Sequence, residues 1–462
     1  MAMPERLVVI GGDAAGMSAA SQARRGRGPD DLEILAFERG DYTSYSACGI
    51  PYLIGGSVPE VGSLIVREPE VFRERQSIEV RIHHEVIAID LDRRALRVRS
   101  LDDAAESWES FDQLLIATGG TPRRPPLVNS EARGIFGVQT LNDGLAVRAF
   151  IEAEGPKKAV VVGGGYIGLE MAEALVDQGL DVVLIEQRDH PMAAFDPDMG
   201  EVISRGLTRM GIELHTAESV VAFETTGDAV SAVLTTHGTV PADIVILGLG
   251  TAPNSGLAAT AGVGIGSSGA IAVDAHMRTD APGVWAAGDC AEKFHRVSKA
   301  NVSIALGTHA NKEGRVAGIN LGGGEATFPG VLGTATSKVC GLELARTGLN
   351  ELEASGAGFD HQSATIDSTT RAGYYPGAAE IKIKVVFERG SGRLLGGQII
   401  GQEGAAKRVD VIAVALWNEM TVDEMINLDL SYAPPFSPVW DPVLIAARKA
   451  AHVIEAATAP AN

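Results

Sequence analysis

The sequence predicts an α/β fold with two similar βαβ-type domains and a smaller C-terminal α/β domain. Residues 7–16 read Leu-Val-Val-Ile-Gly-Gly-Asp-Ala-Ala-Gly, and residues 159–168 read Ala-Val-Val-Val-Gly-Gly-Gly-Tyr-Ile-Gly. Each copy has the pattern of a strand, a tight glycine turn and a helix. Each then leads to a second apolar strand that ends in an acid, at residues 33–38 and 181–186. Two parallel units of this kind are typical of Rossmann-like dinucleotide-binding domains.

The remaining segments are expected to complete these sheets and to add a third domain. Short apolar strands are predicted at residues 113–120, 243–248 and 284–289, where they extend the two sheets. From about residue 330 the pattern changes to longer alternating strands, at residues 380–387 and 394–400, followed by helices. Because this part has no phosphate-binding turn, we expect it to be an α/β domain of the dimerisation type.

Composition excludes several classes of partner. The 462-residue chain has a net charge of −20, which disfavours nucleic acid and anionic lipid. Its apolar runs are much shorter than the roughly 20 residues of a membrane helix, so no membrane partner is expected. Three widely spaced cysteines argue against a disulfide framework and for a reducing compartment. Since the first residues lack a signal-peptide pattern, we expect a cytoplasmic protein.

The second glycine turn fits a dinucleotide site at every position. In such a fold the first glycine permits the turn, the second admits the pyrophosphate, and the third lets helix and strand pack closely. Here these are Gly163, Gly165 and Gly168, and Glu186 is the acid that accepts hydrogen bonds from a ribose. Glu186 repels a 2′-phosphate and favours NADH, whereas Arg188 makes NADPH the alternative.

The first glycine turn departs from the pattern at one position. Gly11 and Gly16 are in place and Glu38 is the acid, but Asp13 stands where the middle glycine belongs. A carboxylate beside a pyrophosphate is unfavourable because the two negative charges repel each other. We expect the chain either to turn this side chain away or to use Gly12 for the close approach.

A family resemblance extends these motifs. The two nucleotide units, together with residues 279–290 (Thr-Asp-Ala-Pro-Gly-Val-Trp-Ala-Ala-Gly-Asp-Cys), resemble the FAD-dependent pyridine nucleotide-disulfide oxidoreductases. Residues 117–120 and 248–254 resemble that family's crossings between its flavin and nicotinamide domains, so the resemblance covers nearly the whole chain. It implies an FAD-binding domain from residues 1–120 and 251–325, an NAD(P)H-binding domain from residues 121–250, and a dimerisation domain from residues 330–462.

The resemblance also assigns cofactor residues. A Gly-Asp pair at the end of such a strand places the aspartate, here Asp289, on the ribityl and pyrophosphate of FAD. The expected FAD residues are Gly11, Gly12, Ala15, Gly16, Glu38, Arg39, Thr118, Gly119, Asp289 and Ala305. The expected NAD(P) residues are Gly163, Gly165, Tyr166, Ile167, Gly168, Glu186 and Gly250.

Cys48 is the expected redox centre. Members with two redox cysteines carry them four residues apart, but Cys48 is followed by Gly-Ile-Pro-Tyr-Leu and has no such partner. Residues 44–56 instead resemble the single-cysteine branch, which includes coenzyme A-disulfide reductases, NADH oxidases and NADH peroxidases. Cys48 is expected at the start of a helix, where the backbone N–H groups and the dipole lower a thiol pKa. Cys290 and Cys340 are expected to be structural.

Tyrosines are the expected proton donors. Residues 429–442 resemble the C-terminal motif of coenzyme A-disulfide reductases, and residues 371–376 resemble their tyrosine-bearing segment. In that family these tyrosines come from the opposite subunit, which implies a homodimer. The candidates are Tyr432 and one of Tyr374 or Tyr375, each able to give a proton to a leaving thiolate.

A coenzyme A site needs basic groups within this acidic chain, because coenzyme A carries a 3′-phosphate and a pyrophosphate. The helix after the first turn ends with a Gln-x-Arg-Arg sequence that resembles coenzyme A-binding members, and its candidates are Gln22 and Arg25, with Ser44 as a further contact. A solvated basic helix end explains the same residues equally well. Ala47 stands where these reductases often carry Asn.

The predicted activity is NAD(P)H- and FAD-dependent reduction of a coenzyme A disulfide or related persulfide through Cys48. Coenzyme A bound to that sulfur is a further candidate cofactor. The first alternative is an NADH oxidase or peroxidase that reduces O2 or H2O2 through a cysteine sulfenic acid. An NADH-binding flavoprotein redox sensor is an alternative of another class. No metal is expected, since His83 and His84 lack metal-ligand spacing. His309 is expected to make an ordinary hydrogen bond.

Overall fold

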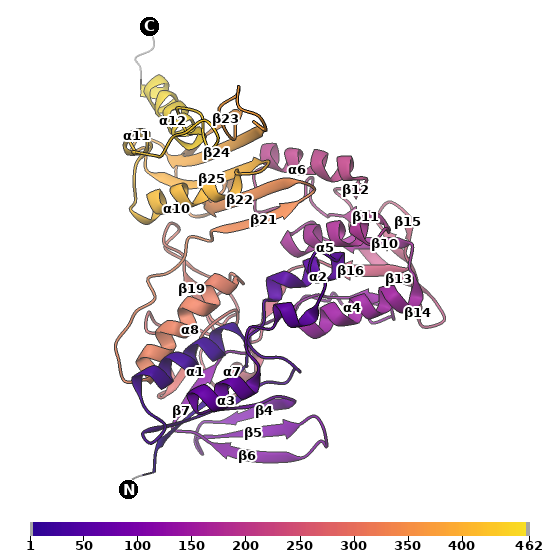
Figure 1. Ribbon diagram of the computed structural model, residues 1–462, viewed down its shortest axis with the longest axis vertical. Helices are drawn as coiled ribbons and strands as arrows, with labels where there is room; N and C mark the ends of the chain where they lie inside the picture. The colour runs from indigo at the N-terminus through magenta and orange to yellow at the C-terminus, as the bar shows by residue number, and fades with distance from the viewer. Residues whose placement is uncertain (1–2, 459–462) are drawn as a thin grey trace.

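The chain folds into three bodies, each built on its own five-stranded sheet (Figure 1). The computed structural model describes residues 3–458. Residues 1–2 and 459–462, which form the outer ends of two expected domains, lie outside this part. The C-terminal five-stranded sheet lies at one end of the molecule (Figure 1). The antiparallel strands β4 (His84–Asp90), β5 (Ala95–Ser100) and β6 (Glu106–Ser110) lie at the other.

The first body contains a parallel sheet with the strand order β18-β7-β1-β2-β3. Its strands are β1 (Glu5–Ile10), β2 (Leu32–Phe37), β3 (Ile78–Arg81), β7 (Gln113–Ile116) and β18 (Val284–Ala286). Because β18 pairs with β7, two segments far apart in the sequence build one sheet. This division agrees with a discontinuous first domain, whose boundaries stay a prediction.

The second body repeats the first. Its parallel sheet has the order β12-β11-β10-β16-β9. In both sheets the strand before the glycine turn, β1 or β10, is central, and the strand that ends in the acid lies beside it. Each body also carries a three-stranded antiparallel sheet. The new strands are β9 (Ile135–Phe136), β10 (Lys158–Val162), β11 (Asp181–Ile185), β12 (Glu213–His215), β13 (Val220–Thr226), β14 (Ala229–Thr235), β15 (Thr239–Pro241) and β16 (Ile244–Leu247). The sequence duplication is therefore a structural duplication.

Helices α1 (Ala14–Gly26) and α8 (Gly307–Leu321) pack lengthwise in the first body. A Cβ at Gly314 would lie 2.3 Å from the carbonyl oxygen of Ala15, and one at Gly318 would lie 2.4 Å from that of Ala19. Only glycine permits such close backbone contact. The pairing holds the start of α1, directly after the first glycine turn, against a helix from almost 300 positions later in the chain.

The third body is an antiparallel sheet of order β21-β22-β25-β24-β23. Its strands are β21 (Ala335–Val339), β22 (Leu342–Gly348), β23 (His361–Thr369), β24 (Glu380–Glu388) and β25 (Leu394–Gly401). Helices α10 (Val409–Trp417) and α12 (Pro442–Thr458) pack on the sheet and share its apolar core. The sheet is joined to the start of α6 (Pro197–Met210), because Gln398 Nε2 donates to Asp196 Oδ2 at 2.6 Å and Lys384 pairs with Asp198 at 2.8 Å.

Shorter elements connect these bodies. Strands β8 (Gly120–Pro122) and β17 (Thr251–Pro253) pair where the chain passes between the first two bodies. The other elements are α2 (Ile50–Gly55), α3 (Pro69–Gln76), α4 (Leu141–Glu154), α5 (Tyr166–Asp177), α7 (Gly256–Thr260), α9 (Glu351–Gly356), α11 (Val422–Ile426), β19 (Lys293–Phe294) and β20 (Asn301–Val302). Among residues 3–458, no helix is both long and apolar enough to cross a membrane.

Candidate active site

The first glycine turn is built from backbone contacts that exclude larger residues. Gly11 has a φ of +112°, and a Cβ there would lie 2.1 Å from the carbonyl oxygen of Ala117. A Cβ at Gly16 would lie 1.9 Å from the carbonyl oxygen of Gly11. Glu38 fixes the turn from β2, since its carboxylate accepts from the N–H of Gly12 at 2.8 Å and from that of Gly40 at 2.7 Å. Helix α1 begins directly after this turn, and its free N-terminal N–H groups are the donors that a phosphate site uses.

The second glycine turn has the same construction. Gly163 has a φ of +97°, and a Cβ at Gly168 would lie 1.9 Å from the carbonyl oxygen of Gly163. Glu186 accepts from the N–H of Gly164 at 2.7 Å and from that of Arg188 at 2.9 Å. At Gly165 the nearest atom to an added Cβ is the carbonyl oxygen of Gly248 at 3.9 Å, so the middle-glycine position is not crowded by the protein. The arrangement fits a second dinucleotide.

Asp289 lies at the end of β18, in the first body. Its Oδ1 is buried and has no hydrogen-bond partner in the protein. An unpartnered buried carboxylate oxygen beside a phosphate-binding turn fits the ribityl or pyrophosphate contact expected for FAD. Thr118 lies at the crossing between the bodies, where its Oγ1 donates to the carbonyl of Asn254 at 2.7 Å. Gly119 beside it has a φ of +66°.

Asp13 turns away from the helix that it precedes. It occupies the N-cap position of α1 but makes no side-chain capping bond, and its Oδ1 accepts instead from the N–H of Tyr45 at 3.3 Å. Burial raises the pKa of Asp13 to about 7, and the charges of Glu38 and Asp289 add to this rise. The chain therefore turns the Asp13 side chain away, which is the first of the two arrangements expected from the sequence. A protonated Asp13 would also relieve the repulsion expected beside a pyrophosphate.

Cys48 lies in a short 3-10 turn, Ala47–Gly49, directly before α2. The residue is exposed, yet desolvation is the largest of the effects that raise the pKa of its thiol, followed by the carboxylates of Glu170 and Asp289. The prediction of a lowered pKa is therefore wrong for the protein atoms alone. Helix α2 has only six residues, so its dipole is weak, and Glu170 reaches this region from α5, which packs against α2.

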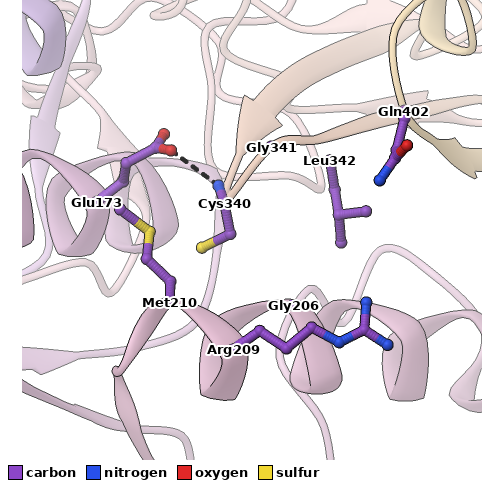
Figure 2. A pocket seen from close by; sticks show the side chains of 8 residues that line it. All are labelled: Glu173, Gly206, Arg209, Met210, Cys340, Gly341, Leu342 and Gln402. Atoms are coloured by element: carbon purple, nitrogen blue, oxygen red, sulfur yellow. Dashed lines mark hydrogen bonds between the residues drawn. The ribbon is translucent and has the colours of Figure 1, made fainter. Parts of the chain in front are cut away.

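The surroundings of the other two cysteines do not suit a redox role. Cys290 is completely buried, and its Sγ lies 3.5 Å from the carbonyl of Ile116. Cys340 lies in the turn between β21 and β22, at the edge of an open cavity of about 350 Å³ (Figure 2). Its backbone N–H donates to Glu173 at 2.8 Å, and burial together with Glu173 and Asp177 raises the pKa of its thiol to about 12. Such a thiol is poorly reactive.

The C-terminal tyrosines meet on the surface of the third body. The phenol groups of Tyr432 and Tyr374 lie close to each other, and the pKa of Tyr432 is raised by slight desolvation and then by its interaction with Tyr374. The N–H of Ala372 donates to the carbonyl of Pro434 at 3.1 Å and ties the two segments together. Tyr374 is 78% exposed and Tyr375 is 37% exposed. Of the two expected partners of Tyr432, the structure brings Tyr374 to it.

The remaining candidates divide between turns and surfaces. Gln22 and Arg25 lie on α1 and hydrogen-bond to each other at 3.3 Å. The N–H of Ser44, a residue with a φ of +49°, donates to the carbonyl of Gly12 at 3.0 Å. The other expected positions flank the same features: Ala15 in the first turn of α1, Arg39 after Glu38, Ala305 before α8, Tyr166 and Ile167 in the first turn of α5, and Gly250 before β17. In residues 3–458 no cluster of His, Cys, Asp or Glu is arranged to hold a metal ion.

Comparison with known proteins decides the family. The family described as pyridine nucleotide-disulphide oxidoreductase matches residues 5–314, and the dimerisation domain of that family matches residues 334–442. The chain belongs to this family. The NAD(P)H sulfur oxidoreductase (CoA-dependent) of Pyrococcus abyssi is 40% identical over 96% of this chain and 97% of its own length. The coenzyme A disulfide reductase of Staphylococcus haemolyticus is 32% identical over 96% and 99%.

A solved structure agrees with this assignment. The NAD-dependent persulfide reductase from A. fulgidus has a TM-score of 0.94 and 38% identity, covering 98% of this chain and 84% of that one. Membership in the family confirms the predicted fold class, the class of enzyme, and the use of FAD with a pyridine nucleotide. The individual site residues stay predictions that the geometry now makes specific.

Two parts of this oxidoreductase site were missed by the sequence reasoning. Glu170, on α5, contributes to the raised pKa of the Cys48 thiol and accepts from Ser337 Oγ at 2.8 Å. Lys293 and Glu313 form a completely buried pair beneath the loop that carries Asp289. The only signal for Glu170 is its position one helical turn after Tyr166. The pairing of Lys293 with Glu313 has no sequence signal, since β19 and α8 meet only in the folded chain.

Proposed function

We propose that this oxidoreductase uses NAD(P)H and FAD to reduce a coenzyme A disulfide or a related persulfide through Cys48 alone. The observation that carries the proposal is the exposed Cys48, which forms no disulfide and whose thiol is influenced by the carboxylates of Glu170 on α5 and of Asp289. The burial of Cys290 and the raised pKa of the Cys340 thiol favour structural roles for both, so a dithiol pair is not supported. The sulfur and coenzyme A chemistry named for the relatives from Pyrococcus abyssi and Staphylococcus haemolyticus supports the same substrate class.

The chain supplies binding and orientation for two nucleotides. Gly11, Gly12 and Gly16 would receive the pyrophosphate of FAD, Glu38 its ribose, and Asp289 its ribityl chain. When bound, FAD accepts two electrons from NAD(P)H and delivers them to a sulfur atom. Gly163, Gly165 and Gly168 would hold the pyridine nucleotide. Glu186 places one carboxylate oxygen on the N–H of Gly164 in the second turn and the other on the N–H of Arg188, and this acid at the end of β11 supports NADH as the preferred donor.

The sulfur chemistry balances without a further reductant. The thiolate of Cys48 attacks the disulfide, one thiol leaves, and a mixed disulfide with Cys48 remains. Two electrons and one proton then release the second thiol and restore the Cys48 thiolate. For each disulfide, one NADH and one proton from solvent give two thiols. The phenol of Tyr432 or Tyr374 would donate the proton to the leaving thiolate, and a neutral phenol does so without placing another charge in the site.

We place these tyrosines in the active site of a partner copy, so that a homodimer is the active unit. The match of residues 334–442 to a dimerisation domain supports this arrangement. The chain segment that follows Tyr432 also carries exposed apolar side chains, Phe436, Val439 and Trp440, which are 76%, 70% and 46% exposed. Exposed apolar side chains on a chain with a dimerisation domain are suited to a protein contact.

Arg25 is the best supported contact for the phosphates of coenzyme A. The neighbouring Arg24 is committed to the carbonyl oxygens of Gln76, Leu32 and Ser77, and Arg27 is paired with Glu5. Arg25 bonds only weakly to Gln22 at 3.3 Å and is exposed. Arg25→Ala should raise the KM for coenzyme A disulfide and leave kcat unchanged. A disulfide without phosphates is the control substrate, and an equal rise in its KM would contradict the contact.

The same cysteine supports a second candidate, an NADH oxidase or peroxidase. An exposed cysteine with no resolving partner can be oxidised to a sulfenic acid, which NADH would reduce through FAD to release water.

Three free cysteines in the described chain also support action in the reducing cytoplasm.

Intact mass spectrometry under non-reducing conditions separates the two candidates. A thiol-reversible mass increase equal to one coenzyme A, mapped to Cys48, supports the disulfide reductase. A bare or oxygenated Cys48, with rapid NADH consumption driven by O2 or H2O2, supports the oxidase or peroxidase. Cys48→Ser should abolish disulfide reduction while FAD stays bound, and retention of most activity would refute both mechanisms.

A further inference from the structure

A buried ion pair lies beneath the loop that carries Asp289. The ammonium of Lys293, on β19, is 3.5 Å from Oε1 of Glu313, on α8, and both side chains are completely inaccessible to solvent. Burying a charged lysine and a charged glutamate in such a place carries a large desolvation cost. Pairing and hydrogen bonds offset this cost, so the atoms that they bond show what the pair holds.

Lys293 and Glu313 together bond both backbone polar groups of Gly288, its C=O and its N–H. Lys293 Nζ donates to the carbonyl of Gly288 at 2.8 Å and to that of Ala291 at 3.0 Å. Glu313 Oε2 accepts from the N–H of Gly288 at 2.8 Å. Gly288 directly precedes Asp289, so its N–H and C=O are fixed by two charges from two different elements. Hydrogen bonds to charged groups are the strong ones among protein hydrogen bonds.

The clamped residue is also confined by its neighbours. Gly288 has a φ of +86°, and a Cβ there would lie 2.9 Å from Cβ of Ala15 on α1. A Cβ at Gly314 would lie 2.3 Å from the carbonyl oxygen of the same Ala15. The loop, the start of α1 and the middle of α8 therefore meet at one point. A small shift of Gly288 would move Asp289 relative to the first glycine turn.

We infer that Lys293 and Glu313 are positioning residues for FAD, which hold Asp289 against its ribityl chain and set the electrostatic potential beneath it. The inference rests on the proposed placement of FAD at Asp289, whose unpartnered Oδ1 is buried there. Both side chains bond the backbone of this loop, so we assign them no direct contact with the reacting atoms. His309, one turn before Glu313, adds no positive charge, because burial and the charges of Lys293 and Lys312 lower its pKa to about 4.

Because Lys293 and Glu313 carry opposite charges, their removal should shift the flavin midpoint potential in opposite directions. A purely structural role would not predict this. Removing a cation near a flavin disfavours the reduced, more negative form, and removing an anion favours it. Lys293→Met should lower the midpoint potential of the bound flavin, and Glu313→Gln should raise it. Because the pKa of Glu313 is raised to about 7, mainly by burial, the comparison belongs at pH 8, where this carboxylate is charged.

The experiment measures FAD dissociation and the flavin midpoint potential in the full-length holoprotein. Lys293→Met should weaken FAD binding by about tenfold or more, since it removes two charge-assisted hydrogen bonds. Glu313→Gln keeps an acceptor for the N–H of Gly288 and should weaken binding less. The double variant should bind FAD more tightly than Lys293→Met, because it leaves no unpaired buried charge. Glu292→Gln is the matched control, a buried carboxylate that bonds Ser268 and Asn301 instead.

The outcomes are decisive in either direction. Shifts of opposite sign in the two single variants, with the control unchanged, support the inference. Shifts of the same sign, or none, overturn it, and if Lys293→Met fails to fold, the Glu313→Gln result alone decides. The proposed function fails separately, if the wild-type protein does not bind FAD or if Asp289→Asn does not weaken that binding.

Discussion

Substitution of Gly318 by alanine tests how α8 positions the first nucleotide turn. The added Cβ would lie 2.4 Å from the carbonyl oxygen of Ala19, 2.8 Å from its Cα and 2.8 Å from Cβ of Gln22. Two of these atoms are backbone and cannot rotate away, so α1 and α8 must separate. In an open helix position the same change would add about 1 kcal/mol of stability, through helix propensity. Overpacking of a tight contact costs about 1–3 kcal/mol.

The contact at Gly318 is at the severe end of that range, because it involves backbone at less than van der Waals distance. We expect a net loss of about 2 kcal/mol, which lowers the unfolding midpoint of a domain this size by about 4–8 °C. Since the start of α1 moves with the helix, FAD should also dissociate faster. Release of FAD is followed by its fluorescence during heating, with circular dichroism as the measure of unfolding.

The control is Gly256→Ala on α7, where an added Cβ meets no atom within 4 Å. This variant should be as stable as the wild type or up to about 1 kcal/mol more stable. If Gly318→Ala behaves like the control and retains FAD, the two helices are not held at a fixed distance by backbone contact. The account of how the first turn is positioned would then be wrong.

Three further outcomes follow from the site. Tyr432→Phe should lower turnover by about 10- to 100-fold and change the alkaline limb of its pH profile, whereas Tyr375→Phe should do neither; equal effects would reject the proton-donor role. Glu186→Ala should raise the KM for NADH more than that for NADPH, and a parallel rise in both would reject the ribose contact. The pKa of Asp13 is raised to about 7 by burial, so its protonated form is favoured by folding and its contribution is lost as pH rises from about 4 to 7. Asp13→Asn should therefore become more stable relative to the wild type at pH 8 than at pH 5 in denaturant titrations without FAD, and a constant difference would show that Asp13 does not titrate in this range.

The sequence was informative where the determinants are close together in the chain. Gly11 and Gly16 are five positions apart, as are Gly163 and Gly168, and in each pair the last glycine packs on the first within one turn. The acids end the next strand in both units, and both accept from the N–H of the residue after the first glycine. Turn chemistry and strand order are set by local pattern and parallel pairing, so a reader of the sequence can place them.

The sequence was least informative where charge arrives from a distant segment. A cysteine before a helix is ordinarily expected to have a lowered pKa, but α2 is short and Glu170 and Asp289 approach Cys48 from two other parts of the chain. The clamp on Gly288 likewise joins β19 to α8, and neither residue of the pair follows a motif. In both cases the missing information is which side chain lies across a tertiary contact. Asp289→Asn or Glu170→Gln should therefore change the pKa of the Cys48 thiol more than any substitution in the six residues of α2, because a carboxylate charge near a desolvated thiol outweighs the dipole of so short a helix.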